Sequence, residues 1–139
     1  MGRGILRTKL EEFIAKNHLN KMVKIQDFTK NPFPIIKQAN LFILSSSYEG
    51  LPNVLLESLV LKKFVISSNC RTGPKEILLN GKGGLLFKVG DYKKLSKLIF
   101  FFNSNKKKCN AMLIKSTKAL DRFDYFTNLK KYSEIIESV

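Results

Sequence analysis

The sequence has few of the residues that build metal centres, disulfide frameworks or membrane spans. Cys70, Cys109 and the single histidine, His18, lie far apart and form no C-x-x-C or Cys/His ligand pattern. No apolar run approaches the roughly 18–20 residues that a transmembrane helix needs. The N-terminus alternates charged and apolar residues where a signal peptide would have an apolar core. We therefore expect a cytoplasmic protein with no disulfide, no metal ion and no cofactor.

Acidic residues are also scarce, because 11 Asp and Glu stand against 25 Lys and Arg and give a formal net charge of +14. Such a charge is typical of proteins that bind nucleic acid. The lysines are scattered in short runs, however, and no nucleic-acid-binding motif accompanies them. We interpret most of them as solvated helix faces and expect no nucleic-acid partner. The alternative is a surface for anionic partners, such as phosphate-bearing substrates or an acidic membrane leaflet, with peripheral contact at the inner face of the membrane.

The length of 139 residues and the hydrophobic content of 44% fit a single domain over residues 1–139. Apolar spacing predicts strands at 22–28, 41–45, 64–68 and 85–87. It predicts helices at 6–16, 35–39, 54 to about 62, 75–79 and 92–102, and then further helical pieces divided near 103–105 and 121–124. This alternation indicates an α/β fold with a mostly parallel sheet flanked by helices.

Residue type and spacing predict four further details of the helices. Pro74 suits the first position of a helix, and Asp91 suits an N-cap. The most apolar helical patch, formed by Leu98, Ile99, Phe101 and Phe102, should face the sheet. The last helix carries an apolar stripe formed by Phe126, Leu129, Tyr132 and Ile136.

The segment SSSYEGLPNVLLESL (residues 45–59) leads from a buried strand through a loop into a helix. In open parallel sheets, ligands bind at the carboxyl ends of the strands. If the chain between Glu49 and Glu57 were helical, the two would lie about 12 Å apart along its axis, too far to share a proton. They suit separate hydroxyl groups of one elongated ligand, while the backbone N–H groups near residues 50–53 suit an anion. A sugar nucleotide combines these features.

The segments SSSYEGLPNVLLESL, FVISSNCRTGPKEIL and GGLLFKVGD occur here in that order. Together with GRGILRTKLEEF, NPFPIIKQAN and the closing RFDYFTNLKKYSEII, they resemble the C-terminal donor-binding domain of GT-B fold glycosyltransferases of group 1, family 4. The resemblance covers nearly the whole chain. It implies a Rossmann-like sheet, C-terminal helices that pack on it, and transfer of a hexose-type sugar from a nucleotide sugar. The implied acceptor is a glycan or lipid-linked glycan in bacterial surface polysaccharide synthesis.

The resemblance also implies roles for individual residues. Glu49 would contact hydroxyls of the donor sugar near the reacting face, which makes it the candidate catalytic residue. Glu57 would accept hydrogen bonds from the ribose. Backbone amides near the donor sugar and diphosphate would come from Gly50, Leu51, Asn53 and the neighbours of Pro52. Glu76 matches a segment that frames the same cleft, although an ordinary glutamate in the first turn of a helix explains it equally well.

Departures from the family pattern limit what the resemblance implies. The strand and the Gly-Arg and Lys-Gly segment whose arginine and lysine hold the diphosphate are absent from this sequence. Asp27 stands where the family commonly has glycine, and it would either repel a diphosphate or point to solvent. We expect a truncated or split gene product that needs an N-terminal glycosyltransferase domain or a homodimer. The alternative is a noncatalytic remnant or basic module that binds nucleotide sugar, anionic lipid or nucleic acid.

Overall fold

The computed structural model describes residues 4–137. The chain divides into two compact units, Met1–Pro32 and Phe33–Val139, which are described separately. None of the helices in the described residues is long and apolar enough to cross a membrane.

The first unit contains one helix and an irregular segment. Helix α1 (Arg7–Lys16) confirms the helix predicted at 6–16, and Ile14 is its buried residue. The strand predicted at 22–28 is wrong, because residues 23–29 are irregular. Alternating apolar residues give a segment two faces, but a strand forms only when its N–H and C=O groups pair with a neighbouring strand. None of the described strands pairs with this segment.

Asp27 forms an ion pair with Arg7 within the first unit. Arg7 also pairs with Glu11, one helical turn along α1, at 2.8 Å. The hydrogen bonds that Arg7 donates to the carboxylates of Glu11 and Asp27 raise the pKa of Arg7 above its ordinary value. The side chain of Asp27 is 75% exposed, which agrees with the solvent alternative, although neither alternative included the pairing with Arg7.

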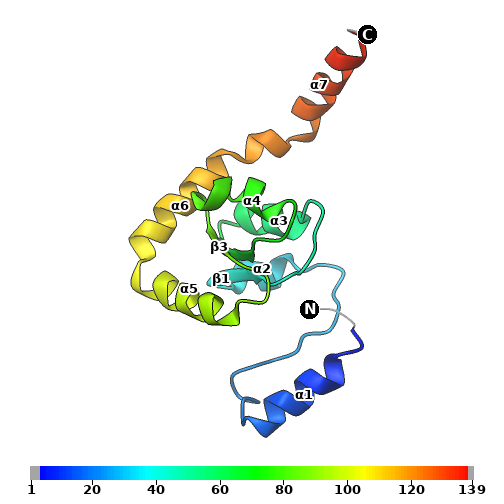
Figure 1. Cartoon of the computed structure of the whole chain (residues 1–139). Coiled ribbons are helices and arrows are strands. Elements are labelled where there is room, and N and C mark those ends of the chain that lie inside the picture. Colours follow the sequence, from blue (N-terminus) through cyan, green and yellow to red (C-terminus); the bar gives the residue numbers. More distant parts are fainter. Residues whose placement is uncertain (1–3, 138–139) are drawn as a thin grey trace. The chain divides into compact units, whose positions relative to one another are not determined.

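The second unit is built on a parallel sheet of three strands in the order β1-β2-β3 (Figure 1). The strands are β1 (Leu41–Leu44), β2 (Phe64–Ser68) and β3 (Leu85–Phe87). Parallel pairing aligns Leu41 with Phe64 and Ile66 with Leu85. All five residues of the central strand β2 are buried, as the apolar run predicts for a strand covered on both faces.

A helix follows each strand, as the sequence predicts, and one further helix precedes the first strand. Their bounds are α2 (Phe33–Gln38), α3 (Asn53–Val60), α4 (Pro74–Ile77), α5 (Tyr92–Ser104), α6 (Lys106–Lys118) and α7 (Tyr125–Glu137), with short 3-10 turns η1 (Leu79–Gly81) and η2 (Leu120–Phe123). Pro74 is the first residue of α4, as predicted. The carboxylate of Asp91 accepts a hydrogen bond of 2.8 Å from the backbone N–H of Lys94, which confirms it as the N-cap of α5.

Two apolar clusters form the core, one on each face of the sheet. On one face Phe64 and Ile66 pack with Leu98, Phe102 and Cys109 from α5 and α6. The rings of Phe64 and Phe102 stack with centroids 5.4 Å apart. On the other face Val65 packs against residues of α3 and α4, namely Leu55, Leu59, Ile77 and Leu78. Because side chains alternate along a strand, β2 supplies both clusters. The predicted α/β fold with a parallel sheet between helix layers is confirmed.

The C-terminal helices differ in how they pack. Leu98, Ile99, Phe101 and Phe102 pack toward the sheet, which confirms the prediction for this patch. Burial raises the pKa of the Cys109 thiol on α6. The predicted stripe on α7 does form on a helix, but Phe126, Leu129, Tyr132 and Ile136 are exposed.

Candidate functional site

Two loops meet at the carboxyl edge of the sheet, one after β1 and one after β2. Because the strands are parallel, residues 45–52 and 69–73 leave the sheet on the same side. The buried hydroxyl of Ser68 donates a hydrogen bond of 2.6 Å to the carbonyl oxygen of Ser46. Further along, the hydroxyl of Thr72 donates to the carbonyl oxygen of Glu49. The second loop therefore fixes the backbone of the first.

Gly73 brings the two loops into closer contact than any other residue type would permit. A Cβ atom at this position would lie 2.4 Å from the carbonyl oxygen of Gly50 and 2.3 Å from Cδ of Pro52. Gly73 also has a φ of 86°, which L side chains rarely adopt. The backbone of Gly73 thus packs directly against the loop before α3.

Helix α3 begins with an N-terminus that no side chain caps. Pro52 occupies the N-cap position and has no side-chain acceptor. The N–H of Leu55 bonds to the carbonyl oxygen of Pro52 at 2.9 Å, so the first turn is tight. The preceding N–H groups, from Asn53 and Val54, have no intrahelical acceptor, which is the usual state of a helix start. Such a terminus carries partial positive charge and suits an anion.

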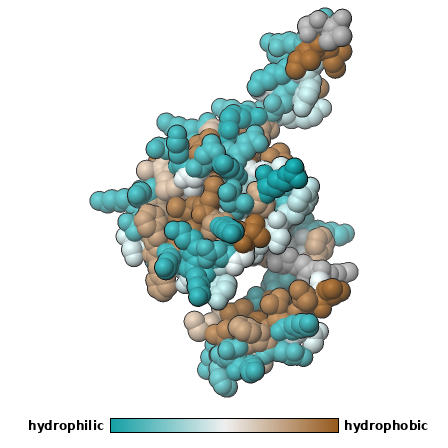
Figure 2. Space-filling view, in the orientation of Figure 1, coloured by the Kyte–Doolittle hydropathy of each residue, from teal (hydrophilic) through white to brown (hydrophobic). Residues whose placement is uncertain are grey.

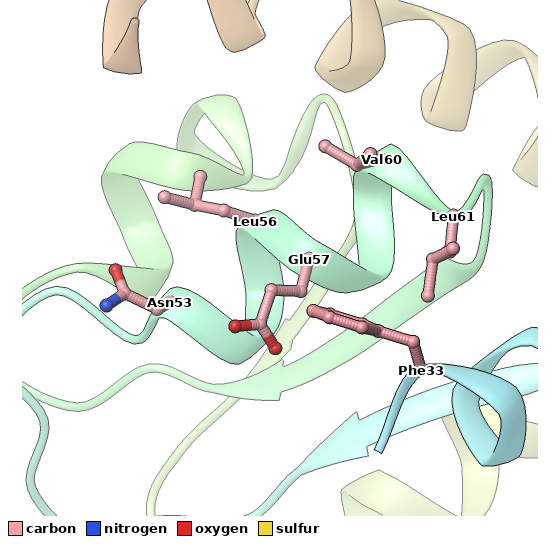
Figure 3. A pocket seen from close by; sticks show the side chains of 6 residues that line it. All are labelled: Phe33, Asn53, Leu56, Glu57, Val60 and Leu61. Atoms are coloured by element: carbon pink, nitrogen blue, oxygen red, sulfur yellow. The ribbon is translucent and has the colours of Figure 1, made fainter. Parts of the chain in front are cut away.

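A pocket of about 490 Å³ lies beside α3. Its lining residues are Phe33, Asn53, Leu56, Glu57, Val60 and Leu61 (Figure 3). Asn53 and Glu57 are one turn apart on α3 and therefore share a face. Figure 3 shows the Glu57 carboxylate and the Phe33 ring on the same side of that helix. Polar groups from the helix and an aromatic ring from α2 thus line one apolar cavity.

The two glutamates of the motif have different surroundings. Glu49 lies in the loop and is half-buried, with its backbone held by Thr72. Glu57 lies on α3, half-buried in the wall of the pocket. Among residues 4–137, neither carboxylate forms an ion pair with a lysine or arginine. Both carboxylates are therefore available to hydroxyl groups of a ligand.

The structure brings together part of the predicted site. Asn53 and Glu57 line the pocket, whereas Gly50, Leu51 and Pro52 form the loop that leads into α3. Phe33 was missed as a lining residue. The sequence offered a weak signal for it, an aromatic residue that opens a helix directly after Asn31 and Pro32 and ahead of the first sheet strand.

Glu76 and the acidic residues generally add no metal site. Glu76 is exposed on α4, and its backbone carbonyl accepts a hydrogen bond of 3.3 Å from Arg122. No group of three or more His, Cys, Asp or Glu side chains in the described part of the chain is placed to hold a metal ion.

Solved structures of glycosyltransferases share this fold. HepE from Anabaena, solved in complex with UDP, matches 95% of this chain and 36% of its own with a TM-score of 0.85 and 21% identity. TarM matches 94% of this chain and 26% of its own with a TM-score of 0.83 and 19% identity. The fold is that of the Rossmann-like half of a GT-B glycosyltransferase.

Curated relatives in sequence are also named as glycosyltransferases. An uncharacterized glycosyltransferase of Methanocaldococcus jannaschii, MJ1059, is 47% identical over 78 residues, which are 56% of this chain and 19% of that protein. In Campylobacter jejuni, N-acetylgalactosamine-N,N'-diacetylbacillosaminyl-diphospho-undecaprenol 4-alpha-N-acetylgalactosaminyltransferase is 30% identical over 89 residues, 64% of this chain and 24% of that protein. The chain thus matches about a fifth to a quarter of the length of these relatives. The model of the family "Glycosyl transferases group 1" matches residues 1–119, and the chain belongs to that family.

Proposed function

We propose that this chain supplies the donor site of a hexosyltransferase that uses a nucleotide sugar. The observation that carries the proposal is the pocket beside α3, which Glu57, Asn53 and Phe33 line together and which includes the first residue of a helix whose N-terminus no side chain caps. A nucleoside diphosphate needs acceptors for ribose hydroxyls, an apolar face for its base and donors for its phosphates. The pocket and the helix start offer all three.

Each group has a proposed task. The Glu57 carboxylate accepts hydrogen bonds from the ribose hydroxyls, and Phe33 packs against the base. The first N–H groups of α3 and the amides of residues 50–53 approach the diphosphate. Glu49, in the loop held by Thr72, contacts hydroxyls of the donor sugar and is the proposed residue nearest the reacting carbon.

Sugar transfer breaks the bond between the anomeric carbon and a diphosphate oxygen and forms a bond from that carbon to the acceptor hydroxyl oxygen. Negative charge gathers on the departing diphosphate, which takes up the proton that the acceptor hydroxyl loses. A helix N-terminus aimed at that charge stabilises it, and fixed positions of the two substrates lower the entropic barrier. The loop packing around Gly73 would keep these donors in place. The nucleotide sugar is a substrate, and the proposal assigns no step to a metal ion or cofactor.

The acceptor is proposed from the relatives. The Campylobacter jejuni relative is named for a diphospho-undecaprenol acceptor, and a Staphylococcus aureus relative, 25% identical over 85 residues, is named as a poly(ribitol-phosphate) alpha-N-acetylglucosaminyltransferase. We propose a glycan or lipid-linked acceptor of bacterial surface polysaccharide synthesis, at the inner face of the membrane. An N-terminal glycosyltransferase domain or a second copy of the chain would complete the reaction.

A titration of the chain with nucleoside diphosphates by calorimetry tests the donor site. Hydrogen bonds to a charged group contribute about 1.5–3 kcal/mol, so Glu57→Ala should weaken binding by roughly tenfold to a hundredfold. Glu134→Ala, an equal charge change on the exposed surface of α7, should leave the affinity unchanged. Equal affinities of Glu57→Ala and the unmutated chain, together with a steep salt dependence, would instead indicate a basic module that attracts anions without a ribose site.

A further inference from the structure

The layer formed by α5 and α6 carries charge of one sign only. Residues 92–120 contain eight lysines and no Asp or Glu. All eight are exposed, namely Lys93, Lys94, Lys97, Lys106, Lys107, Lys108, Lys115 and Lys118. Within residues 4–137, none of them forms an ion pair. The protein itself therefore leaves this cationic surface without neutralising charge.

Large apolar side chains are exposed among these lysines. Phe100 on α5 is 71% exposed and Ile114 on α6 is 48% exposed. Lys93, Lys97 and Phe100 follow at spacings of four and three, so they share one face of α5. On α6, Ile114 and Lys118 are likewise four residues apart. Figure 2 shows hydrophobic and hydrophilic side chains side by side on the surface of the second unit.

A groove adjoins this layer where α6 passes the turn between α3 and β2. Two neighbouring pockets of about 280 and 240 Å³ share three lining residues, Lys62, Asn110 and Leu113. Lys118 and Ile114 line the first pocket, and Lys106 lines the second. The groove thus combines apolar walls, aliphatic in the first pocket and partly aromatic in the second, with ammonium groups. That combination matches the boundary between the phosphates and the acyl chains of a phospholipid.

We propose that the α5–α6 surface and this groove bind a bilayer that contains anionic phospholipid. Lysines near such a surface are attracted by its negative potential, and exposed apolar side chains insert at the headgroup boundary. A nucleic acid would use the same lysines, but it gains from aromatic rings on which bases stack. The two phenylalanines that line the groove, Phe64 and Phe102, are buried and cannot stack on bases, while its other apolar residues include Leu113 and Ile114, which favours lipid.

The position of the groove leaves the donor site accessible. The second pocket is lined by Asn40 and Lys62, which lie one residue before β1 and two residues before β2, at the amino ends of the strands. The loops of the proposed donor site, residues 45–52 and 69–73, lie at the carboxyl ends of the same strands. The inference rests on the proposed function in taking the membrane as the place of the reaction, but the groove and the donor pocket share no lining residue, so lipid binding and donor binding can fail separately.

Co-sedimentation of the full chain with phosphatidylglycerol–phosphatidylcholine vesicles tests the proposal. The test variant replaces Lys93, Lys97, Lys107 and Lys118 with Gln, and the control variant makes the same four-charge change at the exposed Lys37, Lys75, Lys82 and Lys88. A lysine near an anionic surface changes the affinity about fivefold, so the test variant should bind roughly a hundredfold or more weakly. The control variant should lose less than about tenfold. Equal losses in the two variants would overturn the assignment of the surface.

The apolar part of the surface is tested by Phe100→Ser combined with Ile114→Ser. This variant should bind the anionic vesicles more weakly even at high salt, where the charge attraction is screened. Its affinity for a single-stranded oligonucleotide should stay unchanged. Tight oligonucleotide binding with no preference for anionic over neutral vesicles would overturn the lipid proposal in favour of nucleic acid. A nucleoside diphosphate titration of each variant shows whether the fold and the donor site remain intact.

Discussion

Gly73 packs so closely against Gly50 that a Cβ on Gly73 would lie 2.4 Å from the carbonyl oxygen of Gly50. The contact joins the loop after β2 to the loop that carries Glu49. Glycine is required here both by the close approach and by the positive φ. The loop that carries Glu49 therefore depends on Gly73, a residue that takes no direct part in the proposed binding.

Replacement of Gly73 with alanine should destabilise the protein more than a positive φ alone accounts for. A left-handed conformation costs a non-glycine residue about 1–2 kcal/mol. The overlap with Gly50 and Pro52 adds to this cost, because backbone must move. Gly90→Ala is the matched control, since Gly90 has a φ of 80° and nothing lies within 4 Å of its would-be Cβ. Urea unfolding should show a larger loss for Gly73→Ala, and equal losses would contradict the packing argument.

Substitutions of Glu49 and Glu57 should affect the binding of different parts of the donor. Glu57→Gln removes the negative charge and replaces one of the two acceptor oxygens proposed for the ribose with an N–H donor, so it should weaken the binding of both a nucleoside diphosphate and its sugar conjugate. Glu49→Gln should weaken only the sugar conjugate, by about tenfold, because its proposed partners are sugar hydroxyls. Calorimetric titration of both ligands against both variants measures the difference. If Glu49→Gln weakened both ligands equally, the proposed contact with the sugar would be wrong.

Phe33 should contribute to base binding through the area of its ring. Stacking on an aromatic side chain contributes about 1–3 kcal/mol per base, so Phe33→Ala should weaken nucleoside diphosphate binding by roughly fivefold to a hundredfold. Phe33→Tyr keeps the ring and should retain most of the affinity. Phe126→Ala removes an exposed ring from α7 and serves as the control. A normal affinity in Phe33→Ala would show that the base lies elsewhere.

Asp124 should stabilise the start of α7 in a pH-dependent way. Its carboxylate accepts a hydrogen bond of 2.8 Å from the backbone N–H of Thr127, which lowers the pKa of Asp124 below its ordinary 3.8. Because the pKa is lower in the folded state, this stabilisation is present above pH 3.8 and is lost as the pH falls through the lowered pKa. NMR should show faster amide exchange at Thr127 in Asp124→Ala. Asp124→Asn should keep the cap and lose the dependence on pH, so identical exchange in all three proteins would argue against the cap.

Local signals in the sequence were accurate where one side chain and its neighbours decide the outcome. Pro74 begins α4 and Asp91 caps α5, because a fixed φ and a short carboxylate act within a few residues. The alternation at residues 22–28 failed as a strand, since a strand also needs a partner that the pattern cannot supply. The stripe on α7 shows the same limit, because helical spacing predicted the helix but not whether anything covers its apolar side.

The sequence by itself determined the α/β alternation, the buried central strand and the two carboxylates of the motif, since these follow from hydrophobic period and residue type. The tertiary structure decided what those residues meet. Phe33 and Glu57 are far apart in the chain and line one pocket only because α2 and α3 lie side by side. Gly73 supports Gly50 only because parallel strands deliver both loops to one edge of the sheet. Contacts between distant segments depend on how the strands pair and the layers pack, which no local pattern encodes.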